Sequence, residues 1–154
     1  MDNRDGNWKQ EVFDAFRKVL AAKASSAASE LESIAAACEN ETKSSAGDKY
    51  ETAREMLSQA RTMQLRLLEE AKLALDWLGR QDPQATHGKV AAGALARLDD
   101  GWILVSPFPV QLDVDGRMVR SLSLASPLGR ALKGAALGEA RTFRDRVIEV
   151  LELV

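Results

Sequence analysis

The stretch that decides the fold is residues 8–38, WKQEVFDAFRKVLAAKASSAASELESIAAAC. It contains no proline or glycine and many alanines, which favours a helix because alanine loses no side-chain entropy there. An apolar stripe follows spacings of 4, 3, 4, 3 and 4 through Leu20, Ala24, Ala27, Leu31, Ile34 and Cys38. This alternation keeps a narrow seam facing a partner helix, so it predicts one long helix of a coiled coil.

The partner helix is predicted to follow after a reversal of the chain. Residues 39–47 are polar and turn-forming, and Ser45 with Asp48 fits a capping box at the start of a helix. This second helix runs to about Gly79. Its predicted seam consists of Met56, Ala60, Met63, Leu67, Ala71, Ala74 and Leu78. We therefore expect an antiparallel coiled-coil hairpin over residues 1–80, with Trp8 at its open end within reach of Trp77.

The pattern changes in the second half of the chain. Residues 81–88 contain proline, glycine and polar residues without periodicity, which indicates a linker. Beyond it, short apolar runs separated by turns predict a β-rich domain over residues 89–154. Strands are expected at 90–98, 102–105, 110–114, 118–124, 140–143 and 147–153, with a short helix capped by Ser126 before the last two. The predicted fold class is α+β, a helical hairpin followed by a small β-rich domain.

Composition and charge limit the partners of this chain. It has 154 residues, 45% of them hydrophobic and 29% charged, which is typical of a soluble folded protein. The net charge of −2 and the lack of a basic half argue against binding of free DNA. We see neither a signal peptide nor a run of about 20 apolar residues that could span a membrane. We expect a cytoplasmic protein that binds no membrane.

The sequence offers little for autonomous catalysis. Its one histidine, His87, lies in the predicted linker, where we expect it to be an ordinary surface residue. No nucleophile motif accompanies it, so we expect neither an enzyme nor a cofactor of its own. Four carboxylates surround the predicted reversal, and these are Glu39, Glu41, Asp48 and Glu51. They are able either to share a divalent cation with another protein or simply to cap a helix end.

Two stretches carry a resemblance to a known family. Residues 47–55, GDKYETARE, are similar to Asn-Ala-Glu-Tyr-x-x-Ala-Arg-Glu, and residues 125–134, ASPLGRALKG, are similar to Ser-Pro-Ile-x-x-x-Leu-x-Gly. Both motifs are typical of Gre-type bacterial transcription elongation factors, the GreA/GreB family, which the chain resembles over nearly its whole length.

The resemblance implies a fold and a partner. The domain at 89–154 would be FKBP-like, and the hairpin would be a finger that enters the secondary channel of RNA polymerase. The partner-binding residues implied in this way are Lys43, Ser44, Ser45, Tyr50 and Arg54 near the tip, and Ser126, Pro127, Leu128 and Gly129 in the second motif.

The tip departs from the pattern of the family. In Gre-type factors acidic tip residues help to hold a catalytic Mg²⁺, so that backtracked RNA is cleaved in the active site of the polymerase. Aligned on Tyr50, these positions fall on Lys43 and Ala46, neither of which can bind a cation. We hypothesise that the flanking Glu41 and Asp48 share Mg²⁺ with the polymerase instead. Without such a substitution the protein would occupy the channel without stimulating cleavage, which the departure favours.

Two other functions fit the same sequence. An FKBP-like domain suggests peptidyl-prolyl isomerase activity, although fold analogy alone does not establish it. The aromatic residues available for such a pocket are Trp102, Phe108 and Phe143. A helical hairpin also suits an adaptor that binds another helix. Because the hairpin pairs internally, we expect a monomer.

Overall fold

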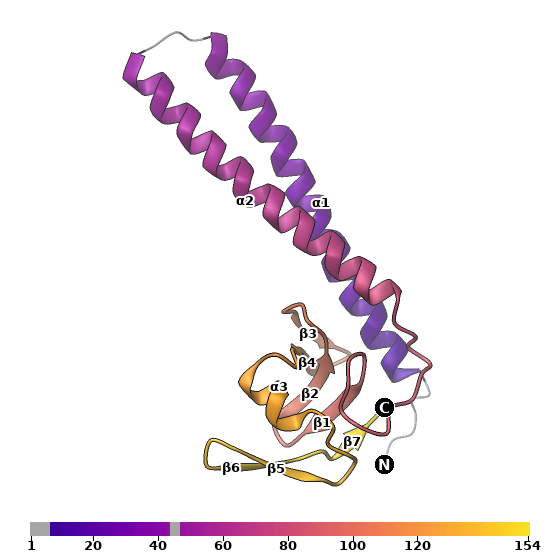
Figure 1. The fold of residues 1–154 in the computed structure, drawn as a ribbon. Coiled ribbons are helices and arrows are strands. Elements are labelled where there is room, and N and C mark those ends of the chain that lie inside the picture. The colour runs from indigo at the N-terminus through magenta and orange to yellow at the C-terminus, as the bar shows by residue number, and fades with distance from the viewer. Residues whose placement is uncertain (1–6, 44–46) are drawn as a thin grey trace. The chain divides into compact units, whose positions relative to one another are not determined.

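The computed structural model describes the backbone of residues 7–43 and 47–154, and the side chains of residues 7–40 and 49–154. Two long helices come first, α1 over Trp8–Lys43 and α2 over Gly47–Gly79 (Figure 1). The strands and the short helix that follow are β1 (Leu95–Leu98), β2 (Gly101–Val105), β3 (Gln111–Val114), β4 (Arg117–Leu122), α3 (Pro127–Leu132), β5 (Ala140–Phe143), β6 (Arg146–Glu149) and β7 (Glu152–Leu153). This order confirms the predicted α+β class, a helical hairpin followed by a small β-sheet domain.

The chain divides into two compact units. The hairpin unit comprises Arg17–Trp77, and the sheet unit joins the start of α1, as far as Phe16, to Leu78–Val154. Both long helices therefore contribute residues to both units. None of the helices in the described part of the chain is long and apolar enough to cross a membrane.

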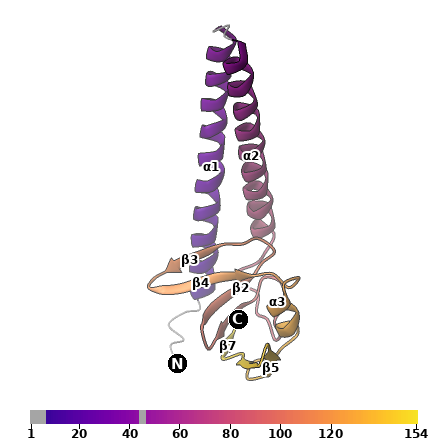
Figure 2. The same cartoon turned by 90° about the vertical axis from the view of Figure 1, so that its left-hand side faces the viewer.

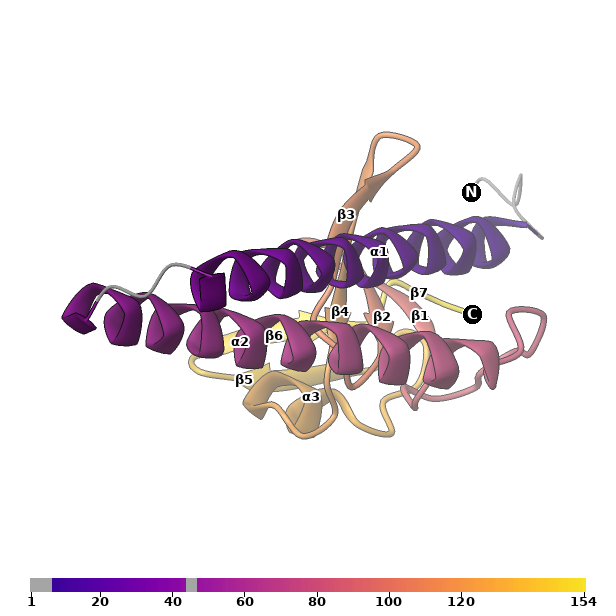
Figure 3. The ribbon, with the colours of Figure 1, turned by 90° about the horizontal axis from the view of Figure 1, so that it is seen from above.

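In the hairpin unit, α1 and α2 run side by side in opposite directions (Figures 1 and 3). The predicted seam of α1 is confirmed. Leu20, Ala27 and Ile34 are buried, and the other seam residues, Ala24, Leu31 and Cys38, are half-buried. Helix α1 ends at Lys43, within the polar segment 39–47 in which the sequence predicts that the first helix stops. Residues 39–43 are polar but include glutamate and lysine, which are good helix formers.

The predicted seam of α2 is correct near its base and at Ala60, and wrong at Met56, Met63 and Leu67. Ala71, Ala74 and Leu78 are buried, whereas Met56 and Met63 are 66% and 63% exposed. The expected seam contained two successive steps of four residues, because it followed the apolar side chains. A coiled-coil seam instead keeps alternating steps of three and four. Counted back from Leu78, that rule leads to the half-buried Gln64, Ala60, Leu57 and Ala53, but it fails at Leu67, which is 43% exposed while its neighbour Leu68 is half-buried.

In the sheet unit, the main sheet has the strand order β3-β4-β2-β1-β7 (Figure 1), and Figure 2 shows β3, β4 and β2 from another side. Strands β2 and β4 are parallel, whereas β1 pairs with β2 and β7, and β3 pairs with β4, in antiparallel fashion. Strands β5 and β6 form a separate antiparallel pair. The core between these elements includes Leu98, Ile103, Leu132 and Val150, each at most 1% exposed.

Two predicted strands are shorter than expected. The first begins only at Leu95, because Gly93 has a φ of 86° and turns the chain before it. The last expected strand, 147–153, is two strands that belong to different sheets, β6 and β7. Between them the backbone N–H of Val150 donates to Glu139 and that of Leu151 donates to Arg97, so the chain changes sheets at this point.

Candidate partner-binding surfaces

The tip of the hairpin carries several of the residues predicted from the sequence. Glu41 and Lys43 belong to the last turn of α1 and Asp48 to the first turn of α2, but their side chains lie outside what the structure describes. Ser44 and Ser45 lie outside the described residues altogether. The hypothesis that Glu41 and Asp48 share Mg²⁺ therefore stays a prediction.

Two of the predicted tip residues are described. Tyr50 is half-buried and Arg54 is exposed, and both belong to α2. Four residues apart on a helix, they lie on the same face, one turn from each other. Among the described side chains, no group of three or more histidine, cysteine, aspartate or glutamate residues is placed to hold a metal ion. The described part of the tip thus offers an aromatic ring and a guanidinium to a partner.

The second predicted motif begins α3 in the sheet unit. The Ser126 side chain caps the helix, because its Oγ accepts a hydrogen bond from the backbone N–H of Gly129 at 3.0 Å. The same hydroxyl donates to the backbone oxygen of Ser123 at 2.6 Å. Pro127 follows in the first turn, where a missing N–H costs nothing. The sequence predicts this cap correctly.

Gly129 and Leu128 face inward from the same helix. A Cβ atom on Gly129 would lie 1.9 Å from the backbone oxygen of Ser123 and 2.7 Å from Cα of Leu124, so only glycine fits. Leu128 packs against the hydrophobic core. Of the four residues predicted to bind a partner here, Ser126, Leu128 and Gly129 thus shape the helix itself, and Pro127 is exposed.

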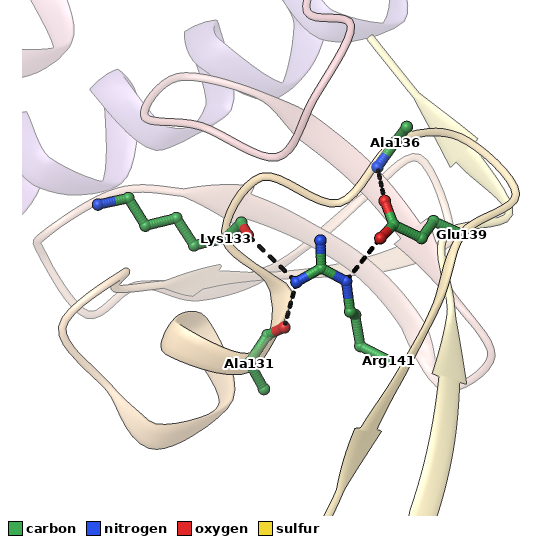
Figure 4. Close-up of polar contacts among 5 residues, drawn as sticks. All are labelled: Ala131, Lys133, Ala136, Glu139 and Arg141. Carbon is green, nitrogen blue, oxygen red and sulfur yellow. Dashed lines mark hydrogen bonds and ion pairs between the residues drawn. The ribbon is translucent and has the colours of Figure 1, made fainter.

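A clamp holds the other end of α3 and was not predicted from the sequence. Nη1 of Arg141, on β5, donates to the backbone oxygens of Ala131 at 3.3 Å and Lys133 at 3.5 Å (Figure 4). Its Nε donates to Glu139 at 2.9 Å, and the other oxygen of Glu139 accepts from the N–H of Ala136. The pKa of Glu139 is lowered, mainly by the hydrogen bond from Ala136 and to a smaller extent by that from Arg141.

The cap and the clamp together leave one face of α3 to the solvent. Pro127, Arg130 and Lys133 are exposed on it, at spacings of three residues. Both ends of the helix are fixed by hydrogen bonds, so this face is presented rigidly. Its two cations suit an acidic partner surface.

A second cluster missed by the sequence surrounds Trp8. Its ring lies edge-on to that of Trp102 on β2, with the centroids 5.7 Å apart, and the guanidinium carbon of Arg117 on β4 lies 4.4 Å from the Trp8 ring centroid. Trp8 is 4% exposed, and its Nε1 has no hydrogen-bond partner among the described residues. The expected proximity of Trp8 to Trp77 stays a prediction, and the contact with Trp102 was missed because helix spacing contains no information about rings on strands.

His87 also differs from expectation. It is not a plain surface residue, because it is half-buried and its Nδ1 lies 3.0 Å from Nζ of Lys9 on α1. The sequence separates these two residues by 78 positions, so no local pattern predicts their contact.

We compared the chain with known proteins. No model of a known family matches it, and no curated protein matches it either. Among solved structures, that of the transcription factor Gfh1 aligns with 89% of this chain and 92% of its own, with 17% sequence identity and a TM-score of 0.35. Because this TM-score is low, we base the function on the residues of the chain itself.

Proposed function

We propose that the protein is a transcription regulator that binds RNA polymerase in the cytoplasm and inserts its helical hairpin into the secondary channel. It acts as an accessory factor and not as an enzyme of its own. The observation that carries this proposal is the length of the hairpin. Helices of 36 and 33 residues extend about 50 Å at 1.5 Å per residue, far more than the core of the sheet unit needs.

The two family motifs support the proposal. GDKYETARE opens α2 next to the tip, and ASPLGRALKG forms the capped helix α3 in the sheet unit. The motifs thus belong to separate units, one suited to enter a channel and one suited to anchor the protein outside it. The basic face of α3 is a candidate for the anchoring contact.

We further propose that the protein occupies the channel without stimulating RNA cleavage. Lys43 and Ala46 stand where Gre-type factors carry their acidic pair. If Glu41 and Asp48 replace that pair, the protein stimulates cleavage instead and needs Mg²⁺ for it. A cleavage assay with backtracked polymerase from the same organism separates the two modes, because only the second shortens the RNA.

Channel insertion is tested by photo-crosslinking. A photoreactive amino acid replaces Lys49, which is exposed in the first turns of α2, and a matched variant carries it at the exposed Lys18 on α1, further from the tip. We expect Lys49 to crosslink to polymerase residues that line the secondary channel, next to the active site. Lys18 should give crosslinks only nearer to the channel entrance, or none.

The outcomes separate binding from insertion. Capture of the polymerase with crosslinks from Lys49 inside the channel supports the proposal. Capture with crosslinks only on the outer surface of the polymerase contradicts insertion but keeps the partner. A failure to capture the polymerase at all contradicts the proposed function.

A further inference from the structure

Lys9 and His87 join two parts of the chain that are far apart in sequence. Lys9, in the first turn of α1, is only 5% exposed. Its Nζ donates to the backbone oxygen of Ala85 at 2.8 Å and lies 3.0 Å from Nδ1 of His87. Both partners belong to residues 80–88, the connecting segment between α2 and the sheet. The buried ammonium group of Lys9 therefore links this segment to α1, beside a longer hydrogen bond from Nε2 of Gln84 to Oε1 of Gln10 at 3.4 Å.

The contact needs a neutral imidazole. A lysine ammonium group only donates hydrogen bonds, so Nδ1 of His87 has to accept with its lone pair. A protonated ring carries a hydrogen on that nitrogen and places a second positive charge about 3 Å from the first. In a partly buried site such a pair of like charges is strongly unfavourable. Protonation of His87 therefore breaks the contact.

The surroundings of the pair favour the neutral ring. The pKa of His87 is lowered, mainly by burial and to a smaller extent by the charge of Lys9. Hydrogen bonds with the backbone of Ala92 and Val154 act in the opposite direction and raise it. Burial also lowers the pKa of Lys9, and the carboxylate of Asp82 opposes that shift. The charged groups involved are thus Lys9 from α1, which acts on His87, and Asp82 from the connecting segment, which acts on Lys9. Ala92 and Val154 act on His87 through their backbones.

The direction of the pH effect follows from the lowered pKa. When the segment is released, the ring regains its usual pKa of 6.5 and binds a proton more tightly than in the contact. The contact is therefore fully formed above pH 6.5. It weakens as the pH falls below that value and is lost as the pH passes the lower, native pKa.

We propose that Lys9 and His87 form an acid-released latch, in which the neutral ring holds the connecting segment on α1 and protonation of the ring frees it. The step is a reversible uptake of one proton by the imidazole. It involves no other reactant, and it does not depend on binding to RNA polymerase.

NMR titration tests the latch directly, because the chain contains one histidine and its ring signals need no assignment. In the wild-type protein we expect a titration midpoint below 6.5. In Lys9→Met, which keeps the apolar stem and removes the charge, we expect a higher midpoint. The control Lys18→Met removes an exposed lysine from the same helix and should leave the midpoint unchanged.

Hydrogen exchange then tests the release. The amide of Ala85, which donates to Asp82, should lose protection several-fold between pH 7.5 and about 5 after correction for intrinsic exchange. His87→Asn places a non-titrating amide group where Nδ1 lies, so Ala85 should keep its protection in acid. The amide of Ile103, in the main sheet, serves as the internal reference.

Two results would overturn the latch. One is a wild-type midpoint of 6.5 or higher, because the ring would then not be held neutral. The other is an equal corrected protection of Ala85 at both pH values. Both measurements use the wild-type protein, so they decide the question even if a variant fails to fold.

Discussion

Gly129 has no room for a side chain, and this has a measurable consequence. In Gly129→Ala the new Cβ would lie 1.9 Å from the Ser123 oxygen, which belongs to the backbone and cannot rotate away. We expect the free energy of unfolding to fall by about 2 kcal/mol or more, measured by urea denaturation.

The matched control for this substitution is Gly79→Ala at the end of α2. Nothing lies within 4 Å of a Cβ there, so we expect no loss of stability and a small gain from better helix propensity. Equal effects at both glycines would show that the close approach to Ser123 is not a constraint.

At the scale of elements, Gln64 interrupts the apolar seam of α2. It is half-buried where a coiled coil normally has an apolar side chain. We expect Gln64→Leu to stabilise the hairpin by about 1 kcal/mol, because apolar area replaces a half-buried amide. Thermal unfolding followed by the helical circular dichroism measures this change.

Gln59→Leu is the control, since Gln59 is exposed on the same helix. It should change stability by a few tenths of a kcal/mol at most. If Gln59→Leu were the more stabilising of the two, the assigned seam of α2 would be incorrect.

The clamp on α3 is a second test at this scale. Arg141→Lys keeps the charge but removes the planar fork that reaches Glu139 and two backbone oxygens together. We expect a loss of about 1 kcal/mol and faster hydrogen exchange in α3. Arg130→Lys, on the exposed face of α3, should leave both unchanged, and an equal effect there would argue against the clamp.

At the scale of the whole molecule, the division into two units predicts separable unfolding. Ile34 is 7% exposed in the hairpin unit and Ile103 is fully buried in the sheet unit. Each change to alanine should cost about 2 to 5 kcal/mol, but within its own unit. In a Trp77→Phe background, fluorescence reports Trp8 and Trp102 in the sheet unit, whereas the helical dichroism reports mainly the hairpin.

We expect Ile103→Ala to lower mainly the fluorescence midpoint and Ile34→Ala to lower mainly the dichroism midpoint. A parallel shift of both signals in each variant would mean that the molecule unfolds as one cooperative unit.

The sequence by itself determined the features that depend on neighbours along the chain. The two long helices follow from alanine content and the 3–4 spacing, the seam of α1 from the same spacing, and the cap of α3 from Ser126 and Pro127. These are interactions within about four residues, which a linear pattern contains. On α2 the apolar residues pointed to Met63, whereas the regular alternation pointed to Gln64, and at this position the structure agrees with the alternation.

Only the tertiary structure decided the contacts between distant segments. Lys9 meets His87, Trp8 meets Trp102, and the last expected strand divides between two sheets. Each of these depends on which surfaces the packing of the core brings together, and sequence spacing does not contain that information. Local propensity thus fixed the elements, whereas burial of their apolar faces against one another fixed the partners of these side chains.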